Sequence, residues 1–249
     1  MLVGKAKSST IMYNELKKHF YIYKVVQEEP IPMKKIMIKR MKRLGFFSVF
    51  GQILFGLMVL PVLRRLSKKQ YNKVIEDLRI DLTPIDEKCI FKVDSINSKA
   101  CLEFLKKENP DIVIVNGCRI ISNKILSNLK SIFINTHEGI TPLYRGIHGA
   151  YWALVNQDNE HCGVTVHLVD KGVDTGGIIY QGLIYPDDKD NFTTYPLYQT
   201  KKGAELLIHT IEDVFSGDLK YFQPKGESKI WYHPTIWEYF YYRIYRGVK

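Results

Sequence analysis

The chain has 249 residues, 45% hydrophobic and 25% charged, which suits a globular domain with appendages and excludes a compositionally disordered protein. Its 36 basic and 26 acidic side chains give a net charge of +10, which favours an anionic partner such as a nucleotide, nucleic acid or anionic membrane, or serves solubility alone. The four cysteines have no paired spacing, which argues against a zinc site or disulfides and predicts reduced thiols in the cytoplasm.

The first third of the chain predicts two strands and then a helical block. We expect a strand at residues 1–4, a helix at 11–19 capped by the Ser8-Ser9-Thr10 run, and a strand at 21–26. Prolines 30 and 32 break this alternation. Basic and amphipathic helical patterns follow, so residues 32–80 are interpreted as a helical insertion.

One part of this insertion is as long as a membrane span. Residues 44–63 carry no charge and are flanked on both sides by Lys or Arg. Three glycines, Gln52 and Pro61 weaken a spanning interpretation, and positive flanks at both ends give no topology. A buried or interface helix is the favoured interpretation, with no membrane span expected, and contact with a membrane surface stays open as an alternative.

Strands and helices alternate again after the insertion. The expected strands are 90–93, 111–115, 131–134, 163–169 and 177–183, the last two forming a pair, and the expected helices are 98–108, 123–129, 148–156 and 204–215. Such alternation predicts an α/β fold with an open, mostly parallel sheet and helices on both faces. Ligands of such sheets bind beyond the carboxyl ends of the strands.

A tail dense in aromatic and basic residues follows Gly217. Its composition suits a surface that stacks on nucleic-acid bases. It equally suits a segment that packs back on the domain or makes a dimer contact, which is the interpretation we favour. The predicted organisation is therefore a catalytic domain at 1–217, with the helical insertion at about 32–80, and a short aromatic C-terminal extension at 218–249.

Polar residues at one predicted strand end could form an acyl-transfer site. Asn135 and His137 lie two residues apart, and strand geometry places them on the same side. Asn135 and a protonated His137 could stabilise a developing oxyanion. A carboxylate beside the imidazole could favour its charged form and accept a proton from an amine. Asp170 and Asp174, on a glycine-rich loop, are both candidates.

The order of these motifs resembles a known family. Asn135-x-His137, Pro142 to Gly146, Gly163 to His167 and Asp170-x-Gly172-x-Asp174-Thr175-Gly176 resemble the folate-dependent formyltransferases. The resemblance implies a Rossmann-like domain, 10-formyltetrahydrofolate as co-substrate without a metal, and Asn135, His137 and Asp174 as catalytic residues. It also implies folate contacts in two loops, formed by Cys118, Arg119, Ile120 and Ile121 and by Val169, Asp170, Lys171, Gly172 and Val173.

The acceptor is suggested by departures from the family pattern. Only a short tail follows Gly217, where members acting on initiator tRNA carry a further barrel domain, and the usual phosphate loop of purine-pathway members is missing. We therefore predict a cytoplasmic, homodimeric N-formyltransferase acting on a nucleotide-linked amino sugar, with no nucleic-acid partner. Other acceptors, hydrolysis of the donor, and a non-enzymatic nucleic-acid- or membrane-binding protein stay open. The predicted acceptor contacts are Lys5, Ser8, Ser9, Tyr144 and Arg145.

Overall fold

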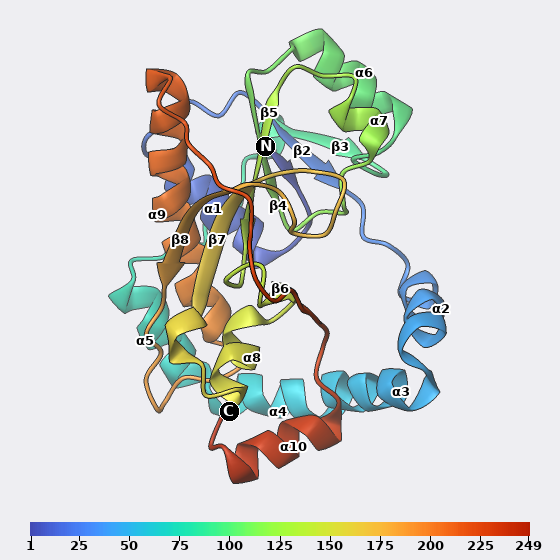
Figure 1. The fold of residues 1–249 in the computed structure, drawn as a ribbon, viewed down its shortest axis with the longest axis vertical. Coiled ribbons are helices and arrows are strands. Elements are labelled where there is room, and N and C mark those ends of the chain that lie inside the picture. Colours follow the sequence, from blue (N-terminus) through green and yellow to red (C-terminus); the bar gives the residue numbers. More distant parts are fainter.

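A seven-stranded sheet forms the centre of the computed structural model, which describes residues 1–249 (Figure 1). The strand order is β3-β2-β1-β4-β5-β7-β8. The first five of these strands are mutually parallel, β7 pairs antiparallel with β5, and β8 pairs antiparallel with β7. The predicted mostly parallel sheet is confirmed. The strands are β1 (Leu2–Val3), β2 (Val25–Glu28), β3 (Ile90–Val93), β4 (Ile112–Asn116), β5 (Ile132–His137), β7 (Gly163–Leu168) and β8 (Ile178–Leu183).

Helices cover both faces of this sheet, as the sequence predicted. Helices α1 (Lys7–Leu16) and α9 (Tyr195–Ser216) lie on one face, and α6 (Lys99–Glu108) and α7 (Asn123–Leu126) on the other (Figure 1). Successive strand residues point to opposite faces. Ile114 therefore packs in the core under α1 and α9, while its neighbour Val113 packs in the core under α6 and α7.

Several element boundaries differ from the predicted ones. Strand β2 begins at Val25 rather than at residue 21, because the preceding tyrosines extend into solvent. Helix α1 begins at Lys7, so the Ser8-Ser9-Thr10 run lies inside its first turn and does not cap it. The reason is a tertiary contact, since the Ser9 hydroxyl donates to Asn116 Oδ1 at 3.0 Å and fixes this turn against β4. Helix α9 begins nine residues earlier than predicted, at Tyr195.

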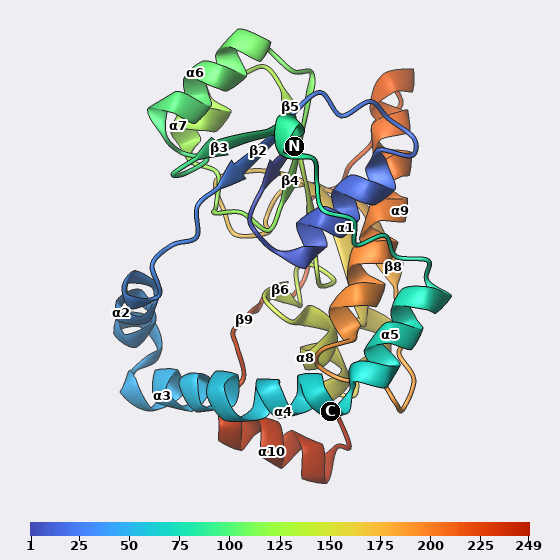
Figure 2. The same ribbon diagram turned by 180° about the vertical axis from the view of Figure 1, so that it is seen from behind.

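The helical insertion is present as expected. It comprises α2 (Met33–Leu44), α3 (Phe46–Leu54), a π-helical turn η1 (Phe55–Val59), α4 (Leu60–Leu66) and α5 (Lys68–Asp77). Residues 46–66 form one continuous helix of 21 residues, the single helix of the chain that is long and apolar enough to cross a membrane by length and composition alone. One side of it packs on the domain through Phe55, Val59 and Leu63. Helix α2 stands away from the sheet (Figure 2).

The C-terminal tail packs back on the domain, which is the favoured of the predicted alternatives. Its helix α10 (Ile236–Tyr245) begins with a capping box formed by Thr235 and Glu238. Tyr239 of this helix is fully buried, and its ring meets the Phe55 ring edge-on. The remaining elements are α8 (Gly149–Val155), the 3-10 turns η2 (Glu87–Cys89) and η3 (Asn159–His161), and a small parallel sheet of β6 (Arg145–Gly146) with β9 (Ile230–Trp231).

Candidate active site

Two polar residues of β5 and one loop residue meet at the carboxyl edge of the sheet. Asn135 and His137 lie inside β5, which runs three residues beyond its predicted end at residue 134. Antiparallel pairing with β7 extends the strand this far and places Asn135 opposite His167. The loop after β7 brings in Asp174, whose φ of 51° lies in the left-handed region. The structure thus brings together all three predicted catalytic residues.

His137 is held between two hydrogen-bond acceptors. Its Nε2 donates to the carbonyl of Tyr144 at 2.7 Å, and its Nδ1 lies 3.4 Å from Asp174 Oδ2. A carbonyl and a carboxylate both accept hydrogen bonds, so the imidazolium is the form of His137 that satisfies both ring nitrogens. The ring is almost fully buried, which keeps its orientation fixed. This geometry suits a cationic donor beside a carboxylate.

Asp174, and not Asp170, is the carboxylate that faces His137. The backbone amide of Gly146 donates to Asp174 Oδ2 at 3.1 Å and fixes that carboxylate. The Asp170 carboxylate instead accepts from the Gly172 amide at 2.9 Å and from the Thr175 hydroxyl at 2.7 Å, so it closes its own loop. The two candidates that the sequence left open are thereby separated.

A further histidine at the site received no role in the sequence analysis. His167 Nδ1 donates to the Leu168 carbonyl at 2.7 Å, so Nε2 is free to accept from Asn135 Nδ2 at 3.1 Å. Burial lowers the pKa of His167, although the hydrogen bond to Leu168 opposes this shift, so the neutral ring is favoured. His167 thereby orients the Asn135 amide. The available signal was the predicted strand at 163–169, which ends near the site.

Most of the predicted folate contacts line one small cavity beside Asn135 and Asp174. Its volume is about 90 Å³, and eight of the nine predicted positions line it, Lys171 being the exception. Its walls include the apolar side chains of Ile120, Ile121 and Val169. The backbone amide and carbonyl of Ile121 take part in none of the chain's backbone hydrogen bonds. Apolar walls with free backbone groups suit contact with one edge of a flat heterocycle such as a pterin, the rest of which would extend beyond so small a volume.

Arg119 holds the folate-side loop rather than offering its guanidinium to a ligand. The guanidinium lies 3.0 Å from Glu28 Oε2 and donates to the carbonyls of Asp94 and Glu29. Its backbone amide donates to Glu28 Oε1 at 2.6 Å. Arg119 therefore ties this loop to the ends of β2 and β3.

Four of the five predicted acceptor contacts are engaged elsewhere in the protein. Lys5 pairs with Glu29 at 2.7 Å, and Ser9 bonds Asn116. The Tyr144 hydroxyl donates to Asp158, and Arg145 donates to the Val173 carbonyl and to Ser228. These contacts indicate structural roles, and Arg145 in particular anchors the loop that carries Asp174. Lys5 and Ser9 line a cavity of about 410 Å³ beside Glu87 and Lys92, and Ser8 lines a different and larger cavity.

That large cavity has a volume of about 690 Å³ and was not predicted. Three cationic side chains line it, namely Lys7 of α1, Arg64 of α4 and Lys68 of α5. His148 and His233 line it too, with ring centroids 4.7 Å apart. Segments distant in the sequence supply these residues, so no local pattern could reveal the cavity. His148 of its wall precedes Gly149, whose amide donates to the carbonyl of Glu138, the residue after His137.

Both of these histidines favour the neutral ring. Burial lowers the pKa of His148 well below its usual range, and the charges of His233 and Arg40 add to this effect. Burial and Arg40 lower the pKa of His233 to about 4. The wall of the large cavity thus combines fixed cations with neutral imidazoles.

The fold and site define a class of protein. The model of the formyl transferase family matches residues 62–211, and the chain belongs to this family. A methionyl-tRNA formyltransferase of Thermodesulfovibrio yellowstonii is 37% identical over 134 residues, which cover 53% of this chain and 42% of that protein. One of Caldanaerobacter subterraneus is 27% identical over 194 residues, covering 71% and 62%. The chain spans about half the length of the curated relatives it matches.

Solved structures confirm the fold. A 4-N formyltransferase from Francisella tularensis superposes with a TM-score of 0.56 at 16% identity, covering 92% of this chain and 74% of that one. A likely sugar N-formyltransferase from Mycobacterium tuberculosis gives 0.57 at 13%, covering 92% and 72%. Phosphoribosylglycinamide formyltransferase from Streptococcus pneumoniae gives 0.54 at 18%, covering 86% and 97%.

Proposed function

We propose that the chain transfers a formyl group from 10-formyltetrahydrofolate to the amino group of a nucleotide-linked amino sugar. The observation that carries the transfer is the constellation of Asn135, His137 and Asp174, in which Asn135 and Asp174 line the small cavity. In this proposal the small cavity receives the pterin and the large cavity receives the acceptor. The membership of the family supports the folate donor.

The residues divide the work of the transfer. A bond forms between the acceptor nitrogen and the formyl carbon, and the bond from that carbon to N10 of the folate breaks. Asn135 donates to the oxygen as it gains negative charge, through the amide hydrogen that His167 does not use. The His137 imidazolium, whose N–H groups face Tyr144 and Asp174, stabilises that oxygen through its positive charge. Asp174 accepts the proton that the amine loses, directly or through water. The folate nitrogen takes up a proton as it leaves.

The size and charge of the large cavity support a nucleotide-linked acceptor. A volume of about 690 Å³ lies in the range of small-molecule sites. Lys7, Arg64 and Lys68 can bind a diphosphate, and the rings of Tyr71 and Phe192 offer apolar surface to a base or sugar. Two of the solved relatives named above are described as a 4-N and a sugar N-formyltransferase.

Methionyl-tRNA is the second candidate acceptor. The two curated relatives reported above are named methionyl-tRNA formyltransferases, and a basic helical surface could contact RNA. This candidate predicts formylation of charged initiator tRNA that weakens steeply with salt. The sugar proposal predicts transfer to small nucleotide-linked amines, with little dependence on salt.

A direct assay separates these proposals. Purified protein with 10-formyltetrahydrofolate is offered a panel of nucleotide-linked 3-amino and 4-amino sugars, glycinamide ribonucleotide and methionyl-tRNA, and formylated product is measured by mass spectrometry. The sugar proposal expects product from at least one nucleotide sugar. Product from methionyl-tRNA alone would replace it by the second candidate. Donor consumed equally without any acceptor would indicate a hydrolase.

A further inference from the structure

The net positive charge of the chain is confined to one segment. Residues 30–75, here called the basic segment, contain 11 of the 36 Lys and Arg residues and no Asp or Glu. The rest of the chain keeps 25 basic and 26 acidic residues, so it is almost neutral. A charge that served solubility alone would be dispersed. Its confinement to one segment indicates a surface that meets negative charge.

The same segment exposes apolar side chains. Eleven of the 24 exposed large hydrophobic residues lie between Ile31 and Leu66, and five more lie on α10. Residues 46–66 form an amphipathic arrangement in which Val49, Phe55, Val59 and Leu63 are buried against the domain. The opposite side, here called the exposed stripe, consists of Phe47, Phe50, Leu57, Met58, Val62 and Leu66. Exposed apolar patches of this extent mark interaction sites.

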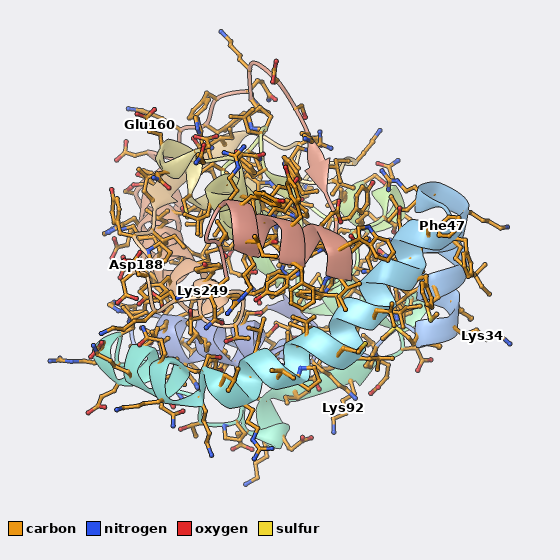
Figure 3. The ribbon with its side chains drawn as sticks, turned by 90° about the horizontal axis from the view of Figure 1, so that it is seen from below. Lys34, Phe47, Lys92, Glu160, Asp188 and Lys249 are labelled. Carbon is orange, nitrogen blue, oxygen red and sulfur yellow. The ribbon has the colours of Figure 1, made fainter.

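Neighbouring helices extend this face. Helix α2 has no buried residue, and it combines six Lys or Arg residues with the exposed side chains of Met33, Ile38 and Met41. It stands clear of the sheet, next to α3 (Figures 1 and 2). Helix α10 lies beside α3 and α4 on the lower face of the molecule and exposes Trp237, Tyr241 and Tyr245 (Figure 3). Tryptophan and tyrosine are enriched where protein meets the lipid headgroups.

We propose that this face, formed by α2, residues 46–66 and α10, binds an anionic lipid bilayer peripherally, with the exposed stripe among the headgroups. Cationic and apolar side chains together on exposed helices are typical of interfacial binding. The helix lies on the bilayer rather than crossing it, because Phe55 fixes its other side in the aromatic core with Phe192 and Tyr239.

Charge complementarity decides against two other occupants. A second copy of the chain on a twofold axis would bring the same surface to itself, and with it the eight Lys and Arg residues of α2 and residues 46–66 against the same eight. Nucleic acid would pair with the lysines and arginines but would leave the exposed stripe in water. An anionic bilayer satisfies both features at once, which is why it is the occupant we propose.

The test is flotation of the full-length protein with vesicles of phosphatidylcholine, with and without phosphatidylglycerol. We expect binding only to the anionic vesicles, weakening as salt rises. Changing Phe47, Leu57 and Leu66 together to Ser should lower the partition coefficient at least about tenfold, because apolar burial contributes much of interfacial affinity. These side chains are 71–78% exposed, so the fold should persist. Reversing charge with Lys35→Glu, Lys39→Glu and Lys42→Glu should lower it similarly.

Matched controls use equally exposed residues elsewhere. Tyr21, Tyr185 and Phe215 changed to Ser, and Lys99, Lys106 and Lys107 of α6 changed to Glu, should leave vesicle binding unchanged. Several results would overturn the proposal. Absence of binding to anionic vesicles, or equal losses in test and control variants, would rule out this face as the binding surface. Retention in membranes after alkaline carbonate would indicate a helix that spans the bilayer. RNA binding in place of vesicle binding, or a dimer that the stripe variant dissociates, would assign the face to another occupant.

Discussion

The basic segment and the carboxyl edge of the sheet are built on opposite plans. At the sheet edge, strand ends and loops hold Asn135, buried His137 and Asp174 in a hydrogen-bonded network with His167, Tyr144 and Gly146. In the basic segment one side of the helices packs on no other part of the protein, and its apolar and cationic side chains lie in water. Rigid, satisfied geometry suits chemistry, whereas an open amphipathic face suits docking. The contrast implies that either region can be damaged while the other still works.

The largest expected effect comes from the sheet edge. Changing His137→Ala, or Asp174→Asn, should lower kcat for formyl transfer by about 10³-fold, because each removes a group that acts on developing charge or on a proton. Single-turnover formylation measures this loss. His209→Ala and Asp218→Asn alter exposed residues of the same types and should leave the rate unchanged. If vesicle flotation fell along with activity in the site variants, the two regions would not be independent.

A smaller loss should follow from the residue that orients Asn135. His167→Ala removes the acceptor of the Asn135 amide hydrogen bond and lets that amide rotate. Misplacement of a donor by about 1 Å lowers rates on the order of 10²-fold, so kcat should fall by that factor even at saturating folate. Saturation is needed because His167 also lines the small cavity. His167→Gln restores an acceptor and should recover part of the rate. Equal losses in both variants would point to a simple packing role.

The sheet edge was readable from the sequence because its signals are local. Asn135 and His137 are two residues apart, and the Asp170 to Gly176 loop follows one strand later. The choice between Asp170 and Asp174 needed coordinates, since it depends on which carboxylate closes its own turn. The role of His167 likewise depends on strand register, which the sequence does not specify.

The acceptor side could not be predicted from the sequence, because its residues are distant from one another along the chain. Lys7, Arg64 and His233 meet only through tertiary packing, and nothing in their own neighbourhoods marks them. The cations chosen from the sequence, Lys5 and Arg145, are nearby but neutralised or tied by internal contacts. An exposed positive residue near a site is therefore weak evidence of substrate contact until its partners are known.

The cations of the large cavity should affect acceptor binding alone. Arg64→Ala, or Lys68→Ala, removes a charged contact of about 1.5 kcal/mol to a diphosphate, so the KM for the acceptor should rise about tenfold. The folate KM should not change. Arg65→Ala and Lys69→Ala are the matched controls, since these neighbours carry the same charge but do not line the cavity. If the controls raised KM equally, the segment would act through its overall charge, and the cavity would not be the acceptor site.

The smallest expected effect at neutral pH is on stability, because it appears only on acidification. His233 has a pKa of about 4 in the folded protein, against 6.5 for the free side chain. Between these pH values the unfolded chain holds more protons, so stability rises with pH and is lost on acidification. For His233 alone about 2.5 kcal/mol, or roughly 5–10 °C in Tm, should disappear between pH 6.5 and 4, and His148, shifted in the same direction, adds to this loss.

A bound anion should reduce this acid sensitivity. Arg40 of the basic segment contributes to the lowered pKa of both histidines, and a nucleotide diphosphate in the cavity would counter its charge. Differential scanning fluorimetry across pH, with and without the nucleotide, measures the effect. We expect a flatter Tm profile with ligand and in His233→Asn. A profile that the nucleotide leaves unchanged would place the anion elsewhere and would remove Arg40 from the acceptor side.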